Sequence, residues 1–355
     1  MSEIYQNPLC GHGIHSQLNG LIPQTSIDSK APLELLQKCP AYQRTPLIDC
    51  AELASQIGVA AVHLKDERGR MNLGSFKALG AAYVIACDAV KSGKELSAVS
   101  LKGATYITAS AGNHGLSVAA GARIFGANAI IYLSKTVPKE FAKQLEAQNA
   151  KVVWHGDDYE ESMQGALDTA ETNSDWILLS DSSWPGYEDL PFLLMEGYLV
   201  LAAEMAEQMN KPPTHLFLQA GVGGLAASIA GFARSVWGEQ LKIIVVEPEA
   251  APALIESIKA GKVVETTGPV SQMGRLDCKK PSLIALKSLA KTADFFMTIS
   301  EKDANNAVSA LEQFGITTTQ SGAAGIAPIF SGSEYLQDLS IDQNSIIAAI
   351  ISEKR

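Results

Sequence analysis

The most constraining feature of this sequence is a series of β-rich runs that recurs at a nearly constant interval. The runs TYITAS, AIIYLS, KVVWHG and WILLSD begin at residues 105, 129, 151 and 176, so successive starts differ by 24, 22 and 25 residues. Helix-like segments such as GLSVAAGARIFG and PKEFAKQLEAQNA lie between them, the second with Pro138 close to its first turn. Strands that alternate with helices form parallel sheets. The sequence therefore predicts an α/β fold.

A second series of strands indicates a second sheet. HLFLQ at 215 precedes the helical segment LAASIAGFARSVWG, KIIVVEP follows at 242, and SIIAAII lies near the C-terminus. The stretch SWPGYEDLP, residues 183–191, is rich in turn-forming residues and separates the two series. At about 150 residues per domain, a chain of 355 residues also favours two domains.

Composition and charge argue against several classes of function. Apolar residues make up 46% and charged residues 19%, which is typical of a compact globular protein. A formal net charge of -10 opposes nonspecific binding to nucleic acid or to an anionic membrane. No run of 18 apolar residues is present to span a bilayer, and the N-terminal segment lacks the pattern of a secretory signal. We expect a cytoplasmic protein with a small-molecule partner.

The cysteines predict neither a disulfide framework nor a metal site. They are five in number, without CxxC spacing, as is typical of reduced thiols: Cys10, Cys39, Cys50, Cys87 and Cys278. The segment CGHGIH offers Cys10, His12 and His15 as metal ligands, but no second cluster follows. We interpret it as a polar loop and expect no metal.

The first of four unusual loops contains Lys77. Ligands of open parallel sheets bind beyond the carboxyl ends of the strands, so the loops there carry function. After AAVHLKDE the chain reads RGRMNLGSFKALG, in which Ser75 is expected to cap a helix with Lys77 as its second or third residue. The helix N-terminus and the apolar neighbours of Lys77 disfavour the ammonium, so we expect a lowered pKa. A neutral amine suits Schiff-base chemistry, whereas a solvated lysine would have no such role.

Three further loops carry polar or glycine-rich sequences. TASAGNHG places Asn113 and His114 at a sheet edge, where Asn113 either binds a ligand or caps a helix. QAGVGGLAAS sets glycines before a helix, which predicts an anion site, although tight packing also explains such a loop. In TTTQSGAAG, Ser321 either hydrogen-bonds a neutral heteroaromatic nitrogen or caps the next helix.

Together the loops resemble those of the fold-type II pyridoxal-phosphate enzymes, which include serine and threonine dehydratases, threonine synthase and cysteine synthase. Within that group the sequence resembles the diaminopropionate ammonia-lyases, through YQRTPL at 42–47, LKDE, SFKALG, TASAGNHG, DSSWPGY at 181–187, FLQAGVGG, VVEPEAA at 245–251 and MGRLDCKKP at 273–281. The resemblance implies two open parallel-sheet domains with the cofactor between them. Residues 79–189 would form a small mobile domain, and residues 1–78 plus 190–355 the large cofactor-binding domain of a homodimer.

The resemblance also implies a role for each matching residue. Lys77 would hold pyridoxal 5'-phosphate as a Schiff base and remove the α-proton of the substrate. Asn113 would bond the phenolic oxygen, and Ser321 would face the pyridine nitrogen, which leaves the ring a mild electron sink suited to β-elimination. The implied phosphate-binding residues are Gly221, Val222, Gly223 and Gly224. The implied substrate-binding residues are Ser110, Ala111, Gly112, His114, Asp181 and Arg275.

Asp181 is also expected to be catalytic. It matches an aspartate of the lyase family that acts near the substrate, where it would hold the distal amino group; an aspartate that caps a turn is the alternative.

Two segments depart from the family pattern. The lyases commonly have an aspartate immediately before GNHG that deprotonates D-substrates, and this chain has Ala111 there. A methyl group cannot accept a proton, so we expect action on the L-isomer through Lys77. Arg275 and Lys280 stand where the lyases have small or acidic residues. If Arg275 faces the site, its guanidinium suits a second substrate carboxylate; on the surface it would have no such role.

The sequence therefore predicts a pyridoxal-phosphate-dependent lyase that acts by β-elimination on an L-amino acid, preferably 2,3-diaminopropionate or a close analogue, and yields pyruvate and ammonia. An L-serine, L-threonine or hydroxyaspartate dehydratase and a β-replacement synthase are alternatives within the enzyme class. A non-catalytic relative that binds an amino acid is the alternative from a different class.

Overall fold

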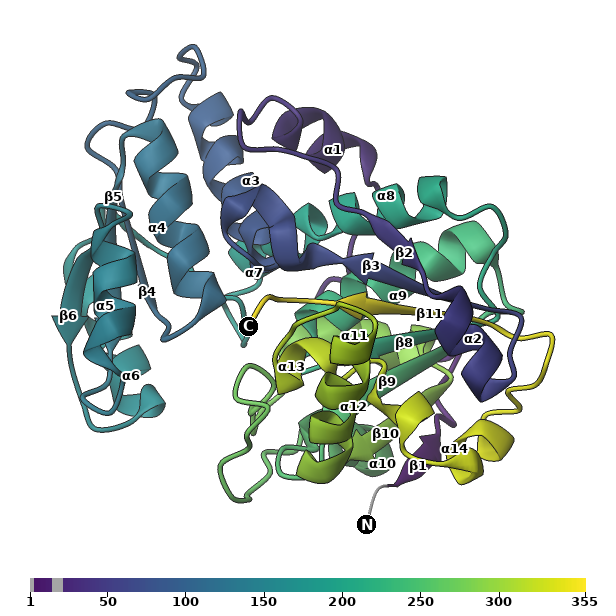
Figure 1. Cartoon of the computed structure of the whole chain (residues 1–355). Helices are drawn as coiled ribbons and strands as arrows, with labels where there is room; N and C mark the ends of the chain where they lie inside the picture. Colours follow the sequence, from purple (N-terminus) through teal and green to yellow (C-terminus); the bar gives the residue numbers. More distant parts are fainter. Residues whose placement is uncertain (1–2, 15–21) are drawn as a thin grey trace.

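The structure, a computed structural model, describes residues 3–14 and 22–355. In this part of the chain the strands form two sheets, and helices α3 and α7 lie between them (Figure 1). The larger sheet has the order β1 (Ile4–Gln6), β10 (Phe295–Ile299), β9 (Lys242–Pro248), β8 (His215–Gln219), β11 (Ile346–Ile351), β3 (Ala61–Asp66) and β2 (Leu47–Asp49). The smaller sheet has the order β6 (Lys151–Trp154), β5 (Asn128–Leu133), β4 (Thr105–Ala109) and β7 (Trp176–Leu178).

The helices alternate with these strands, as the sequence predicts. Those that precede β8 are α1 (Lys30–Leu36), α2 (Ala51–Ile57), α3 (Lys77–Lys91), α4 (Asn113–Phe125), α5 (Lys139–Glu146), α6 (Tyr159–Thr172), α7 (Asp189–Gly197) and α8 (Leu199–Gln208). Those that follow it are α9 (Gly224–Trp237), α10 (Ala253–Ala260), α11 (Leu283–Thr292), α12 (Glu301–Gln313), α13 (Gln320–Ala323) and α14 (Ser333–Asp338). The short 3-10 helices are η1 (Glu67–Asn72) and η2 (Ala327–Phe330).

The prediction of parallel sheets is confirmed for the smaller sheet and for the centre of the larger one, whose two edge strands were not predicted and are antiparallel. All pairs in the smaller sheet are parallel. In the larger sheet, β1 runs antiparallel to β10 and β2 antiparallel to β3. Only residues 50–60 connect β2 to β3, and a parallel crossover needs about a dozen residues or more. The short connection therefore returns the chain antiparallel.

The hydrophobic core runs continuously between the two sheets. Ile85 of α3, Val118 of α4, Leu201 of α8 and Ile229 of α9 all belong to one buried cluster. A second cluster fills the other face of the larger sheet, under α2 and α12. Strands β4 and β8 are buried along their whole length, as expected for parallel strands covered on both faces. Because they share this core, the helices that cover the two sheets are packed against one another.

Two glycines set the crossing of α3 and α7. A Cβ atom on Gly80 would lie 2.7 Å from a ring carbon of Tyr198, and one on Gly197 would lie 2.7 Å from the carbonyl oxygen of Leu79. These distances are too short for any larger residue, so the two helices approach backbone to backbone. The contact fixes α3, whose first residue is Lys77, against the start of α8.

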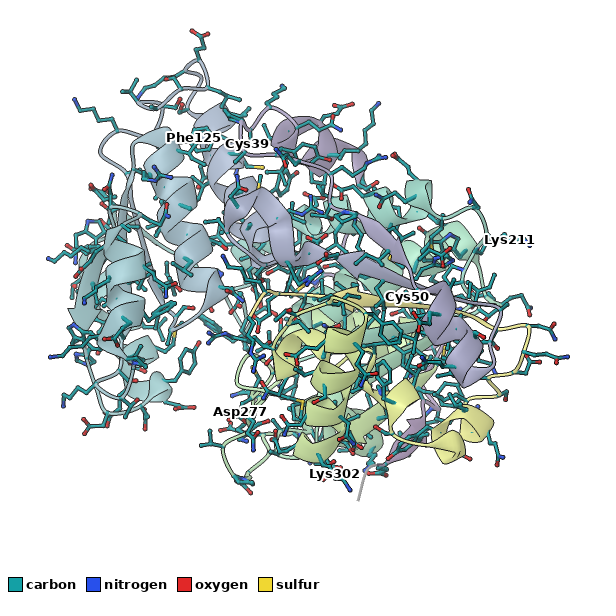
Figure 2. The ribbon with its side chains drawn as sticks, in the orientation of Figure 1. Cys39, Cys50, Phe125, Lys211, Asp277 and Lys302 are labelled. Atoms are coloured by element: carbon teal, nitrogen blue, oxygen red, sulfur yellow. The ribbon has the colours of Figure 1, made fainter. Side chains whose placement is uncertain are left out.

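The structure contains no disulfide among the five cysteines, which all lie in the described residues. All five cysteines are free, and Figure 2 shows Cys39 and Cys50 on separate parts of the molecule. Within residues 3–14 and 22–355, no helix is both long and apolar enough to cross a bilayer.

Candidate active site

Lys77 begins helix α3 and its side chain ends beside Asp181. Its Nζ lies 2.5 Å from Asp181 Oδ2, and both side chains are about one-fifth exposed, at 21% and 22%. Phe76 is the N-cap residue of α3, and the hydroxyl of Ser75 accepts the Lys77 N–H at 3.3 Å. The expected cap position of Ser75 is therefore wrong by one residue, because the helix starts at Lys77 itself.

The pairing with Asp181 overturns the expected lowered pKa of Lys77. Burial by itself lowers the pKa of this amine, but the Asp181 carboxylate outweighs burial and raises it above its ordinary value. Although burial opposes it, Lys77 in turn holds the pKa of Asp181 well below its usual range. The charged pair is therefore the stable form. Local sequence patterns could not reveal this pairing, because the two residues are 104 positions apart.

Aromatic rings surround the Lys77 ammonium. Its Nζ lies 5.3 Å from the ring centroid of Phe76 and 5.8 Å from that of Tyr198, and the two rings meet edge to face at 5.0 Å. Cation–π attraction favours the charged amine at such distances. Sequence reasoning missed Tyr198, which lies between two helices and belongs to none of the recognised motifs.

The glycine loop after β8 needs its glycines for two different reasons. A Cβ atom on Gly221 would lie 3.0 Å from Cys278 Sγ and 3.1 Å from the Arg275 carbonyl oxygen, so the segment 273–281 closes directly over it. Gly223 has a φ of +96°, in the region that favours glycine, and is the N-cap residue of α9. The loop is thus a tight turn at a helix N-terminus.

This loop fits a phosphate group. The Val222 carbonyl accepts the Ser282 N–H at 3.0 Å, which fixes the orientation of the next peptide unit. The first N–H groups of a helix such as α9, from Gly224 onward, have no partner inside the helix and attract anions. The ring of Tyr198 packs beside Gly224. The unpaired N–H groups at this helix N-terminus are what a bound phosphate would satisfy.

The loop after β4 presents Asn113 and His114 at the start of α4. Ser110 Oγ accepts the Gly115 N–H at 3.0 Å, which shapes the turn. The His114 ring contacts the Leu179 carbonyl oxygen through Nε2 at 2.8 Å. A carbonyl can only accept, so Nε2 carries the proton and Nδ1 is the free acceptor. Burial lowers the pKa of His114, which favours this neutral form.

Ser321 and Arg275 are joined through the backbone. Ser321 Oγ accepts the Arg275 N–H at 3.1 Å, so its own proton remains available to an acceptor such as a pyridine nitrogen. The Arg275 side chain, which is half exposed, turns to the loop after β4: Nη1 donates to the Ala111 carbonyl at 3.1 Å. A Cβ atom on Gly112 would lie 2.9 Å from the same nitrogen. The guanidinium therefore faces the candidate site.

Glu353 is a second residue that sequence reasoning missed. Its carboxylate accepts hydrogen bonds from Asn113 Nδ2 and from Thr319 Oγ1, and it is only 5% exposed. It follows the last strand of the larger sheet, whereas Asn113 follows a strand of the smaller one. The only signal in the sequence was its position just after a strand.

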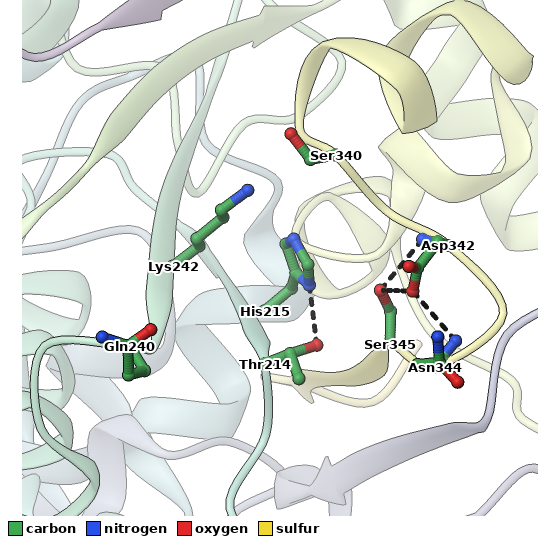
Figure 3. Close-up of a pocket in the computed structure, with 8 residues that line it drawn as sticks. All are labelled: Thr214, His215, Gln240, Lys242, Ser340, Asp342, Asn344 and Ser345. Carbon is green, nitrogen blue, oxygen red and sulfur yellow. Dashed lines mark hydrogen bonds between the residues drawn. The ribbon is translucent and has the colours of Figure 1, made fainter.

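Other hollows of the protein lie away from this chemistry. A depression of about 230 Å³ at the amino-terminal ends of β8, β9 and β11 is shown in Figure 3. Its groups are already engaged: Thr214 Oγ1 contacts His215 Nδ1 at 2.8 Å, and Lys242 donates to a backbone carbonyl. Lys77, the glycine loop and Glu353 all lie at the opposite, carboxyl ends of the strands. Ligands of open parallel sheets bind beyond the carboxyl ends of the strands. The Lys77 site is therefore a better candidate for the active site than the depression.

The described residues contain no group of three metal-binding side chains close enough to share an ion. Cys10 and His12 are within the described part of the chain, and His15 lies outside it.

The amino acid sequence matches a known family over most of its length. Residues 39–353 match the pyridoxal-phosphate dependent enzymes. The chain belongs to this family. Its cofactor is pyridoxal 5'-phosphate, and the lysine, glycine turn and hydroxyl described above are suited to hold its aldehyde, phosphate and ring nitrogen.

Individual members of the pyridoxal-phosphate family are similar to this protein over most of its length. Diaminopropionate ammonia-lyase of Salmonella typhimurium is 32% identical over 85% of this chain and 82% of its own. L-serine dehydratase/L-threonine deaminase of the mouse is 28% identical over 77% of each. The crystal structure of the Escherichia coli diaminopropionate ammonia-lyase with an aminoacrylate–PLP azomethine intermediate has a TM-score of 0.88 and 28% identity, and covers 100% of this chain and 94% of that one. The protein is thus a β-eliminating lyase of this family.

Proposed function

We propose that the protein eliminates ammonia from L-2,3-diaminopropionate or a close analogue, that Lys77 performs the proton transfers and that Asp181 holds the distal amino group of the substrate. The observation that carries the proposal is the 2.5 Å contact between Lys77 Nζ and Asp181 Oδ2. When bound, the cofactor supplies an aldehyde for the amine and a ring that accepts electrons from the substrate α-carbon. The remaining chemistry belongs to the side chains of this chain.

Lys77 would hold the cofactor through its amine and would be free of it once a substrate amine is bound there. Freed in this way, Lys77 removes the α-proton and carries it as an ammonium beside Asp181. Asp181 balances that charge and accepts a hydrogen bond from the neutral distal amine of the substrate. The proton held by Lys77 then passes to the departing amine, so that ammonia leaves as the α,β-double bond forms.

The other loops bind and orient. We propose that Gly221, Val222, Gly223 and Gly224 bind the phosphate, that Asn113 bonds the phenolic oxygen and that Ser321 donates to the ring nitrogen. Ser110, Ala111, Gly112 and His114 would line the substrate. The domain bounds 79–189 and 1–78 plus 190–355, a homodimer and a cytoplasmic location are parts of the same proposal.

The experiment is a measurement of 2-oxo acid release from a panel of amino acids, namely L- and D-diaminopropionate, L-serine, L-threonine and 3-hydroxyaspartate. L-diaminopropionate should give the highest kcat/KM. Turnover of the D-isomer at a comparable rate would contradict the role given to Ala111. Release of no 2-oxo acid, with no visible cofactor band, would instead favour the non-catalytic relative, and turnover only with an added thiol would favour β-replacement.

The residue before GNHG offers a sharper test. Because the Ala111 methyl cannot accept a proton, the substitution Ala111→Asp should introduce a base on the face of the α-carbon opposite Lys77. We expect measurable 2-oxo acid release from D-diaminopropionate in this variant, and Ala111→Asn should give none because an amide is not a base. Equal activity of the two variants toward the D-isomer would show that this position does not select the isomer.

One observation favours a second candidate, a dehydratase for a dicarboxylic amino acid such as 3-hydroxyaspartate. The Arg275 guanidinium reaches Ala111 and Gly112, where a substrate carboxylate would be bound, whereas Lys280 pairs with Glu265 at the surface. If this candidate is correct, Arg275→Gln should raise KM for 3-hydroxyaspartate about tenfold or more and leave KM for L-serine within twofold.

A further inference from the structure

The position of Glu353 is fixed from three directions. Its backbone forms an antiparallel bridge with Ser75, two residues before Lys77. Its carbonyl oxygen accepts the Thr318 hydroxyl at 2.5 Å, and its Cγ lies beside Gly322, the residue after Ser321. The side chain therefore cannot swing away. Its buried carboxylate therefore lies where the loops that carry Lys77, Asn113 and Ser321 meet.

The Glu353 carboxylate is a charged acceptor with three neighbours. Oε2 accepts from Asn113 Nδ2, Oε1 accepts from Thr319 Oγ1, and Arg275 Nε lies 3.9 Å from Oε2. Hydrogen bonds to an ionised acceptor are about twice as strong as neutral ones. Arg275 is half exposed and at the limit of ion-pair distance, so it balances the charge only in part. Most of the negative charge is directed at Asn113 and Thr319.

This contact decides which end of the Asn113 amide faces the site. An amide offers an oxygen that accepts and a nitrogen that donates two protons, and a carboxylate can only accept. The Asn113 nitrogen must therefore point at Glu353 and cannot exchange places with the oxygen. One of its two protons is used by Glu353, and the second remains for another acceptor.

We propose that Glu353 is a positioning residue that locks the Asn113 amide with its N–H toward the phenolic oxygen of the cofactor and places a negative charge next to that contact. The inference rests on the proposed function, because it assumes that Asn113 faces the phenolic oxygen. The contact joins two sheets, since Asn113 begins α4 after β4 of the smaller sheet and Glu353 follows β11 of the larger one. Glu353 thus couples the last strand of one sheet to the cofactor contact of the other.

Two variants separate the charge of Glu353 from its geometry. Glu353→Gln keeps an oxygen that can accept from Asn113 and replaces the other acceptor by an amide nitrogen that can donate to Thr319. Glu353→Ala removes both acceptors and leaves Asn113 free to flip. Glu312→Gln is the matched control, because it removes a carboxylate near the same C-terminus that pairs with Arg355 at the surface.

The readouts are the dissociation constant of the cofactor from the apoprotein and the pH midpoint at which the visible band of the loaded protein changes. For Glu353→Gln we expect a dissociation constant within threefold of the wild type and a midpoint lower by roughly one pH unit, since a nearby anion no longer stabilises the protonated link to Lys77. For Glu353→Ala we expect the same lowering of the midpoint and, in addition, cofactor binding about tenfold weaker. Glu312→Gln should resemble the wild type in both.

A double-mutant cycle decides whether Glu353 acts through Asn113. In an Asn113→Ala background, Glu353→Ala should weaken cofactor binding by less than twofold, because the group it orients is absent. An undiminished tenfold loss in that background, or an unchanged midpoint in Glu353→Gln, would overturn this inference and leave the proposed function intact. Failure of the wild-type protein to form a borohydride-stable link at Lys77 would overturn the proposed function itself.

Discussion

Two lysine–carboxylate pairs in this protein have the same chemistry and opposite surroundings. Lys77 lies 2.5 Å from Asp181 in the candidate site, and Lys65 lies 2.7 Å from Glu204 under the larger sheet. The side chains of the first pair are about one-fifth exposed, whereas those of the second are fully buried. The comparison shows how one kind of ion pair can be either reactive or structural.

The buried pair is part of a closed network. Arg70 donates to Glu67 and to Glu204, while Lys65 also donates to the Thr45 carbonyl at 2.7 Å. Two cations therefore balance two anions. Burial would raise the pKa of Glu204, but Arg70 and Lys65 hold it at about 2; burial lowers the pKa of Lys65 despite Glu204. Every charge has several partners, so none is free to react.

The Lys77–Asp181 pair has fewer polar partners than the buried Lys65–Glu204 pair. Among the described residues, the Lys77 ammonium donates to one carboxylate, and its other neighbours are the rings of Phe76 and Tyr198. A single partner can be exchanged for a bond to a cofactor or for a substrate ammonium. The difference between the pairs lies in the number of polar partners and the access of small molecules.

The largest expected effect comes from removing the reactive amine. Lys77→Ala should abolish the covalent link to the cofactor and lower kcat by about 10²–10⁴-fold or more, because proton transfer alone contributes that much. Borohydride reduction followed by mass spectrometry should find the cofactor on wild-type Lys77. Lys65→Ala, the matched variant of the buried pair, should still carry an adduct at Lys77 if it folds. An adduct at Lys65 in either protein would remove the distinction between the pairs.

The second effect concerns stability. Glu204→Ala leaves Lys65 and Arg70 buried without a shared partner, and breaking such a pair costs about 3–5 kcal/mol of unfolding free energy. Urea unfolding of the apoprotein measures this loss. Glu207→Ala is the control, since Glu207 pairs with Arg44 at the exposed surface, where a pair contributes about 0–1 kcal/mol. Equal losses in the two variants would mean that burial does not distinguish them.

The smallest effect is that of Asp181→Asn on the apoprotein, about 1 kcal/mol, because the pair is partly exposed to solvent. The pKa of Asp181 is lowered by folding, so its contribution is present above its unfolded pKa of about 3.9 and is lost as pH falls through the lower folded value. The pKa of Lys77 is raised, so its contribution is present below about 10.4 and is lost only as pH rises through the higher folded value.

The stability difference between wild type and Asp181→Asn should therefore be constant from about pH 5 to 9 and shrink below about pH 4. Urea unfolding of both apoproteins across this range measures it. A difference that persists unchanged at pH 2 would show that Asp181 acts through packing and not through its charge.

Much of the fold and part of the site followed from local sequence. The spacing of the β-rich runs predicted β4 to β7, and the helices between them, because alternation is a property of neighbouring residues. The glycine loop and Ser321 were recognised for the same reason. The Lys77 pKa was predicted wrongly, and the antiparallel edge strands, Tyr198 and Glu353 were missed. Each of these depends on a residue far away in the chain.

The sequence by itself determined which loops carry an amine, a glycine turn and a hydroxyl, since each is a short motif whose conformation is set by its own residues. Only the tertiary structure decided the charge of Lys77 and the orientation of Asn113. Those properties depend on Asp181, 104 residues from Lys77, and on Glu353, 240 residues from Asn113. Electrostatic and hydrogen-bond partners act over a few ångströms in space, whatever their separation along the chain.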